Sequence, residues 1–159
     1  MVRKYWGVGM IGMAVLVTAV GCADTGGQAG KEASVVGHAA TKSLYARLGG
    51  KPAITAVIDQ FVANVAADSR INARFATTDI PKLKGHLVDQ VCSATGGPCI
   101  YTGRDMKQTH AGMHISSADF ESLVQDLVAA LDHFKVPAAE KNELLGLLGP
   151  MKADIAEVP

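Results

Sequence analysis

The sequence feature that most constrains the fold is a run of apolar residues spaced three and four apart between Gly50 and Asp68. The run comprises Ile54, Val57, Ile58, Phe61, Val62 and Val65. Residues at this spacing lie on one face of an α-helix, so the run predicts an amphipathic helix that ends at about Ala67. The glycine pair before it lets the chain turn sharply, because glycine adopts backbone angles that other residues avoid.

Two further stretches show helical spacing, and each follows a residue that favours a helix start. Thr78-Asp79 precedes the first, whose apolar positions are Leu83, Leu87, Val91 and Ala94, and Gly96-Gly97-Pro98 ends it. Ser116-Ser117-Ala118-Asp119 precedes the second, whose apolar face comprises Phe120, Leu123, Val124, Leu127, Val128, Leu131 and Phe134. We expect a long helix after each start.

The end of the chain predicts one more helix, which begins at Pro137 and is kinked at Pro150. No segment shows the strict alternation of apolar and polar residues that is typical of a strand. The sequence therefore predicts an all-α domain of four main helices and several short ones around one core.

Charge and motifs exclude some classes of function. Lys and Arg number 15, and Asp and Glu also number 15, so the chain has no basic excess and we expect no nucleic-acid partner. No glycine-rich phosphate loop follows a strand pattern, and no Cys-x-x-Cys pair occurs. A nucleotide enzyme and a zinc ribbon are therefore not expected.

The first 21 residues have the pattern of a signal peptide. Arg3 and Lys4 precede an apolar run from Gly7 to Val20, which is short for a membrane span. The run ends in Ala19-Val20-Gly21-Cys22, which resembles a bacterial lipobox, in which the cysteine is lipidated and becomes the mature N-terminus. Cleavage by a general signal peptidase, or an uncleaved anchor, is the alternative.

Residues 22–42 are rich in Gly, Ala, Ser and Thr and predict a flexible tether, which leaves 43–159 as the folded domain. A lipid on Cys22 and this tether would hold the domain at a membrane outside the cytoplasm, on the periplasmic or cell-surface side.

His110 is the candidate ligand for a metal. It lies in the segment from Gly103 to Met113, and a neutral imidazole is a good ligand for haem iron. Since a single histidine on a short helix is more often a surface or core residue, the surrounding motifs decide its role.

Those motifs resemble the group I truncated haemoglobins from Leu44 to about Ile155. The matching pieces, in order, are Leu44-Tyr45-x-Arg47-Leu48-Gly49-Gly50, Ala53-Ile54, Phe61, Thr78-Asp79-Ile80, Leu83-Lys84-x-His86, Gly96-Gly97-Pro98, Tyr101-x-Gly103-Arg104-x-Met106, His110, Phe120 and Val136-Pro137. The resemblance implies a truncated globin, a two-over-two helical sandwich around haem b. The haem should be bound non-covalently, because the chain has no Cys-x-x-Cys-His and no histidine in its final stretch.

The resemblance also assigns roles to residues. It makes His110 the proximal iron ligand and Phe75 the phenylalanine that packs on the haem face. It places Val62, Leu83, Leu87 and Val91 on the distal side, and Tyr101 and Met106 in the haem pocket.

Two distal positions depart from the family pattern. Val62 stands where the family usually has a tyrosine that donates a hydrogen bond to oxygen, and Leu87 stands where glutamine is common. Without these donors, oxygen at the haem loses a charge-assisted hydrogen bond. We therefore expect a nearly apolar distal wall and weak retention of oxygen.

His86 is the remaining polar candidate on the distal side. In some family members a histidine at this helical position binds the iron directly, which would give a haem with two histidine ligands. It could instead donate to a bound ligand or to a haem propionate, or be an exposed residue at the helix edge.

The other two cysteines flank the turn from Ser93 to Pro98. Cys92 and Cys99 are an even pair in a compartment predicted to be oxidising, which favours a disulfide. Two separate thiols, with Cys92 buried as a small hydrophobe, are the alternative.

Several functions fit these features. The first is a tethered haem protein that binds oxygen, NO or CO, or that transfers electrons to a redox partner. The second is a haem enzyme, such as a nitric oxide dioxygenase or a peroxidase-like enzyme, which would need a separate reductase. The third is a module for haem sensing or delivery, and the fourth is an interaction domain that keeps the fold without haem.

Overall fold

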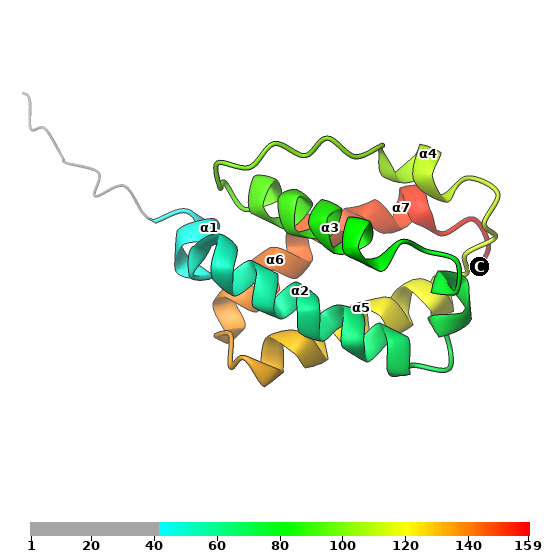
Figure 1. Ribbon diagram of the computed structural model, residues 1–159, viewed down its shortest axis with the longest axis horizontal. Coiled ribbons are helices and arrows are strands. Elements are labelled where there is room, and N and C mark those ends of the chain that lie inside the picture. The colour runs from blue at the N-terminus through cyan, green and yellow to red at the C-terminus, as the bar shows by residue number, and fades with distance from the viewer. Residues whose placement is uncertain (1–41) are drawn as a thin grey trace, which may run out of the picture. The chain divides into compact units, whose positions relative to one another are not determined.

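The computed structural model describes residues 42–159, which form an all-helical domain without strands (Figure 1). The predicted signal peptide, lipidation at Cys22 and nearly all of the predicted tether lie outside the described residues. In chain order the elements are α1 (Leu44–Arg47), α2 (Gly50–Ala67), η1 (Asn72–Phe75), α3 (Ile80–Ala94), α4 (Met106–His110), α5 (Ser117–His133), α6 (Ala138–Leu148), η2 (Gly149–Met151) and α7 (Lys152–Ile155).

Helix α2 is the centre of the packing. It contacts both α3 and α5. Its buried residues are five of the six in the predicted apolar stripe, namely Ile54, Ile58, Phe61, Val62 and Val65, and the sixth, Val57, is partly buried. Leu131 on α5 and Leu144 on α6 complete the core and are among the most deeply buried side chains of the described residues. The two-over-two helical fold predicted from the sequence is confirmed.

Side-chain caps fix the starts of three helices that bear on the cavity described below. Asp79 accepts from the amide of Lys82 at α3, and Asp105 accepts from the amide of Gln108 at α4. Ser116 and Asp119 form a reciprocal capping box at α5. Each cap satisfies amides that have no partner within the helix.

The predicted kink at Pro150 is a break of the last helix. Helix α6 ends at Leu148, a short 3₁₀ segment includes Pro150, and α7 follows from Lys152. Proline cannot donate the next helical hydrogen bond, so the chain changes direction and brings α7 against α4.

A disulfide joins Cys92, at the end of α3, to Cys99 in the loop that follows, with Cα atoms 5.7 Å apart. Gly97 inside this loop packs so closely that an added Cβ would lie 2.5 Å from Tyr45 Cδ2 and 2.7 Å from Cys92 Sγ. Only glycine fits there without a shift of its neighbours, so the bridge and the glycine together fix the loop against α1.

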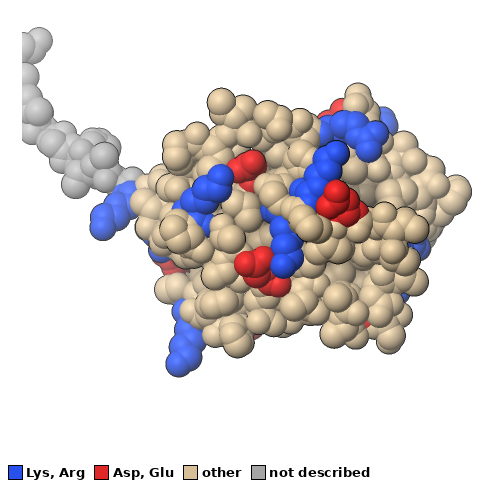
Figure 2. Space-filling view, in the orientation of Figure 1, with Lys and Arg blue, Asp and Glu red and all other residues tan. Residues whose placement is uncertain are grey.

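The face shown in Figure 2 carries basic and acidic side chains close together, with uncharged residues over most of its area. Two ion pairs connect α2 to α3, Lys51 with Asp89 at 3.1 Å and Lys84 with Asp59 at 2.8 Å. Such exposed pairs contribute little to stability. No helix of the described residues is both long and apolar enough to cross a membrane.

Candidate functional site

A cavity of about 670 Å³ lies among α2, α3, α4, α5 and α7. All nine residues that the sequence predicts to contact a cofactor line it: Val62, Phe75, Leu83, His86, Leu87, Val91, Tyr101, Met106 and His110. Its size is within the range of ligand sites in proteins, and its wall is mostly apolar. The fold therefore brings the whole predicted set to one place.

His110 is the last residue of α4 and is held by its own helix. Its Nδ1 lies 2.7 Å from the backbone carbonyl oxygen of Met106. A carbonyl oxygen can only accept a hydrogen bond, so Nδ1 carries the proton in this contact. In the neutral ring Nε2 then has a free lone pair, which is the state that an imidazole needs to bind a metal.

The wall formed by α2 and α3 is mostly apolar, and His86 is one of its few polar residues. Val62 is only 8% exposed, and Leu83 and Leu87 are partly buried beside it. His86 is half-buried, and its ring meets that of Tyr101 edge-on, with centroids 6.3 Å apart and planes at 77°. Tyr101 is fixed in turn, because its hydroxyl donates to the Arg104 carbonyl at 2.9 Å.

Sequence reasoning missed one polar group in this wall, Gln90. Its side-chain nitrogen lies 3.4 Å from the sulfur of Met151 and 3.9 Å from the sulfur of Met106. Thioether sulfurs are weak acceptors, so the amide is only weakly partnered. The available signal was its position, since it lies four residues after His86 and therefore on the same helical face.

Two cations, Lys82 and Arg104, also line the cavity and are exposed to solvent. A ligand with an apolar body and anionic groups at one edge would match this distribution, because its body would meet the apolar wall and its anions these cations. Haem, with its flat ring and two propionates, is such a ligand.

An all-helical two-over-two fold, a large apolar cavity and a histidine with a free Nε2 together define a globin. The family described as bacterial-like globin matches residues 43–157. The chain is 37% identical over 114 residues to a group 1 truncated haemoglobin of Mycolicibacterium paratuberculosis, covering 72% of this chain and 84% of that protein. The chain therefore belongs to the bacterial-like globin family, as a truncated globin of group I.

Two solved structures support the same relationship. The Fe(III) form of truncated haemoglobin from Tetrahymena pyriformis superposes with a TM-score of 0.70 at 29% identity, covering 72% of this chain and 98% of that one. A 2/2 haemoglobin of a Synechococcus species, described as having covalently attached haem, gives a TM-score of 0.68 at 29% identity with the same coverage.

Proposed function

We propose that this globin binds haem b non-covalently in the cavity, with His110 as the proximal ligand, and uses it to bind a diatomic gas. The observation that carries the proposal is the hydrogen bond from His110 Nδ1 to the Met106 carbonyl, which leaves Nε2 free. Haem would supply an iron atom that binds oxygen, NO or CO and that can exchange one electron.

The residues around the cavity fit this cofactor. Phe75, Leu83 and Leu87 offer apolar surface for the ring, and Lys82 and Arg104 offer positive charge for its propionates. A covalent link between haem and a histidine near the C-terminus would need a histidine there, and the stretch after His133 contains none. We therefore expect non-covalent binding.

His86 supports a second candidate function, electron transfer. It lines the same cavity as His110 and comes from a different helix, α3, so it could supply a second histidine ligand to the iron. Two histidine ligands would leave no open position for a gas until His86 dissociates. Such a site favours electron exchange with a redox partner or redox sensing.

Optical spectra of the haem-loaded full chain test both candidates. Binding through His110 predicts a Soret band that His110→Ala weakens or shifts. Iron ligation by His86 predicts a low-spin ferric spectrum that becomes high-spin in His86→Ala. The matched control is His133→Ala, since His133 is exposed and does not line the cavity. A wild-type chain that shows no Soret band after haem addition would overturn the haem proposal.

We also propose that the domain is tethered outside the cytoplasm by lipid on Cys22. The signal-like pattern of residues 1–21 supports this, and so does the Cys92–Cys99 disulfide, because disulfides form in oxidising compartments. Labelling with a radioactive fatty acid in a bacterial host should modify the wild-type chain and not Cys22→Ala. Equal labelling of both would exclude this site.

A further inference from the structure

The loop from Ala111 to Ile115 connects His110 to the start of α5, and its backbone is unusual at two positions. Gly112 has φ 77° and His114 has φ 50°, both in the left-handed region. A residue other than glycine is uncommon there, because its Cβ crowds the backbone. His114 therefore needs contacts that hold it in this conformation.

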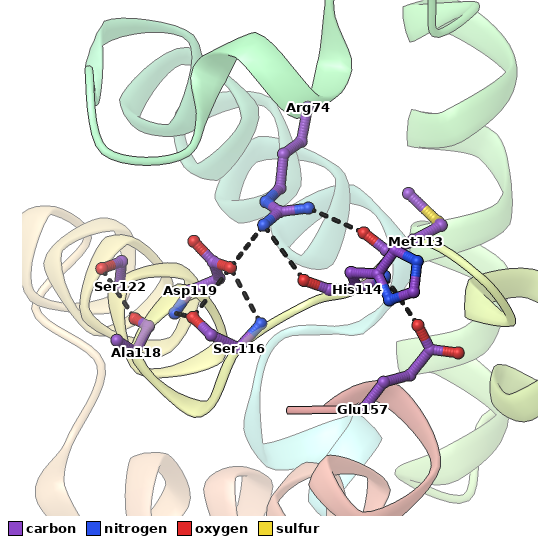
Figure 3. Close-up of polar contacts among 8 residues, drawn as sticks. All are labelled: Arg74, Met113, His114, Ser116, Ala118, Asp119, Ser122 and Glu157. Carbon is purple, nitrogen blue, oxygen red and sulfur yellow. Dashed lines mark hydrogen bonds and ion pairs between the residues drawn. The ribbon is translucent and has the colours of Figure 1, made fainter. Parts of the chain in front are cut away.

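Glu157 supplies the first contact (Figure 3). The backbone N–H of Gly112 donates to its Oε1, and the N–H of His114 donates to its Oε2, both at 2.6 Å. One carboxylate thus accepts from both left-handed residues of the loop. The two backbone N–H donors lower the pKa of Glu157, and the N–H of Gly112 has the larger effect. The carboxylate therefore stays ionised, and its hydrogen bonds are charge-assisted.

The tail around Glu157 follows the same loop. The N–H of Glu157 donates to the carbonyl of Ile115 at 2.9 Å, and the N–H of Ser117 donates to the carbonyl of Val158 at 3.1 Å. Figure 1 accordingly marks the C-terminus beside this loop. The tail is therefore paired to the segment that directly follows His110.

Arg74 holds the loop from the other side. Its Nη1 donates to the carbonyl of Met113 at 3.0 Å, and its Nη2 forms an ion pair with Asp119 at 2.7 Å (Figure 3). Arg74 directly precedes Phe75 in the chain, and Phe75 lines the cavity. Glu157 thus accepts hydrogen bonds from N–H groups of the loop, and Arg74 donates one to a carbonyl of the loop. Two distant parts of the sequence therefore hold the peptide groups of the loop.

We propose that Glu157, with Arg74 opposite it, is a positioning residue that holds the loop Ala111–Ile115 and thereby orients His110 toward the iron. The proposal rests on the haem function proposed above. Helix α4 has only five residues, and so short a helix is unstable by itself. The direction of the His110 ring must therefore depend on what anchors each end of α4. Asp105 caps the N-terminal end of α4, and the loop that Glu157 holds follows its C-terminal end.

The test variant is Glu157→Gln in the full chain, since Gln keeps the shape but places an amide where one N–H needs an acceptor. In the haem-free protein we expect hydrogen exchange at Gly112 and His114 to become at least about tenfold faster. In the haem-loaded protein we expect the iron–histidine stretching band, recorded after photodissociation of CO, to shift, and haem loss to become faster.

The matched control is Glu121→Gln. Glu121 is also an exposed carboxylate in an ion pair, with Lys152 at 3.0 Å, but it accepts no hydrogen bond from the loop. It should change neither exchange at Gly112 and His114 nor the stretching band. Arg74→Gln should loosen Met113 and His114, and Arg74→Lys should restore part of that protection.

Unchanged exchange at Gly112 and His114 in Glu157→Gln would overturn the proposed hold on the loop. Faster exchange with an unchanged iron–histidine band would overturn the positioning of His110. A wild-type chain that takes up no haem would refute the proposed function instead, and the exchange measurement would still test the loop contacts.

Discussion

The Nδ1 atom of His110 and the backbone carbonyl oxygen of Met106 lie 2.7 Å apart within α4, so this five-residue helix carries an imidazole of defined tautomer. The side-chain sulfur of this methionine also lies close to the side-chain amide of Gln90 on α3. Residues from both sides of the cavity therefore meet at the residue that orients His110.

Removal of the His110 ring should be reversible by a free ligand. We expect His110→Gly to retain haem poorly, because the iron loses its protein ligand. Added imidazole should occupy the vacated space and restore an absorption spectrum like that of the wild type. Haem titration followed by absorbance measures this. Circular dichroism of the haem-free variant should be unchanged, and failure of imidazole to restore the spectrum would count against His110 as the ligand.

Val62→Tyr should slow the release of oxygen from the ferrous haem protein. A tyrosine hydroxyl at this wall would donate a charge-assisted hydrogen bond worth about 1.5 kcal/mol, or roughly a tenfold slower release. Stopped-flow displacement of oxygen by CO measures the rate. Val62→Phe is the matched control, because it adds the ring without the hydroxyl, and an equal effect of both variants would assign the change to size alone.

Loss of the disulfide should destabilise the domain. Cys92 and Cys99 close a loop with a sequence separation of 7 residues, and loop closure of this length stabilises by about 2 to 3 kcal/mol in the entropy model. We expect Cys99→Ser to unfold at correspondingly lower urea concentration. Wild-type protein unfolded and refolded with reductant should match the variant, whereas unchanged stability in both would show that the bridge contributes nothing measurable.

Asp126 on α5 should make stability fall as pH rises. Its Oδ2 is buried without a hydrogen-bond partner among the described residues, and burial, followed by the nearby Asp68, raises the pKa of Asp126. When the pKa of a carboxyl is higher in the folded state, the group does not lower the free energy of unfolding at a pH below its pKa in the unfolded chain. This free energy falls as the pH rises from that value through the pKa in the folded state.

We therefore expect Asp126→Asn to be more stable than wild type at about pH 7 and equal to it at about pH 3, where both side chains are neutral. Urea denaturation at a series of pH values measures the difference. Asp154→Asn is the matched control, because Asp154 is exposed. A gain for Asp126→Asn that is the same at every pH would contradict the ionisation argument.

Sequence alone predicted those features that depend on local pattern. The apolar stripe from Ile54 to Val65 gave the buried face of α2, and the short polar side chains of Asp79 and Ser116 gave helix starts, because both effects act within a few residues. The residues lining the cavity came from the family resemblance, which carries the three-dimensional arrangement with it.

The contacts of Arg74 and Glu157 had no such signal. In the sequence each is an ordinary charged residue on an exposed segment. Their roles arise from contacts between distant positions, such as Glu157 with Gly112, which depend on how the broken last helix returns to α4. Only the packed structure brings these positions together.

The depth of Cys92 has a consequence for how preparations of this protein compare with one another. The residue is 0% exposed, whereas Cys99 is only partly buried, so in the folded domain a reductant in solution reaches the bond through Cys99. A reductant present during purification can therefore open the bridge while the domain stays folded, and samples prepared with and without reductant would differ in this bond.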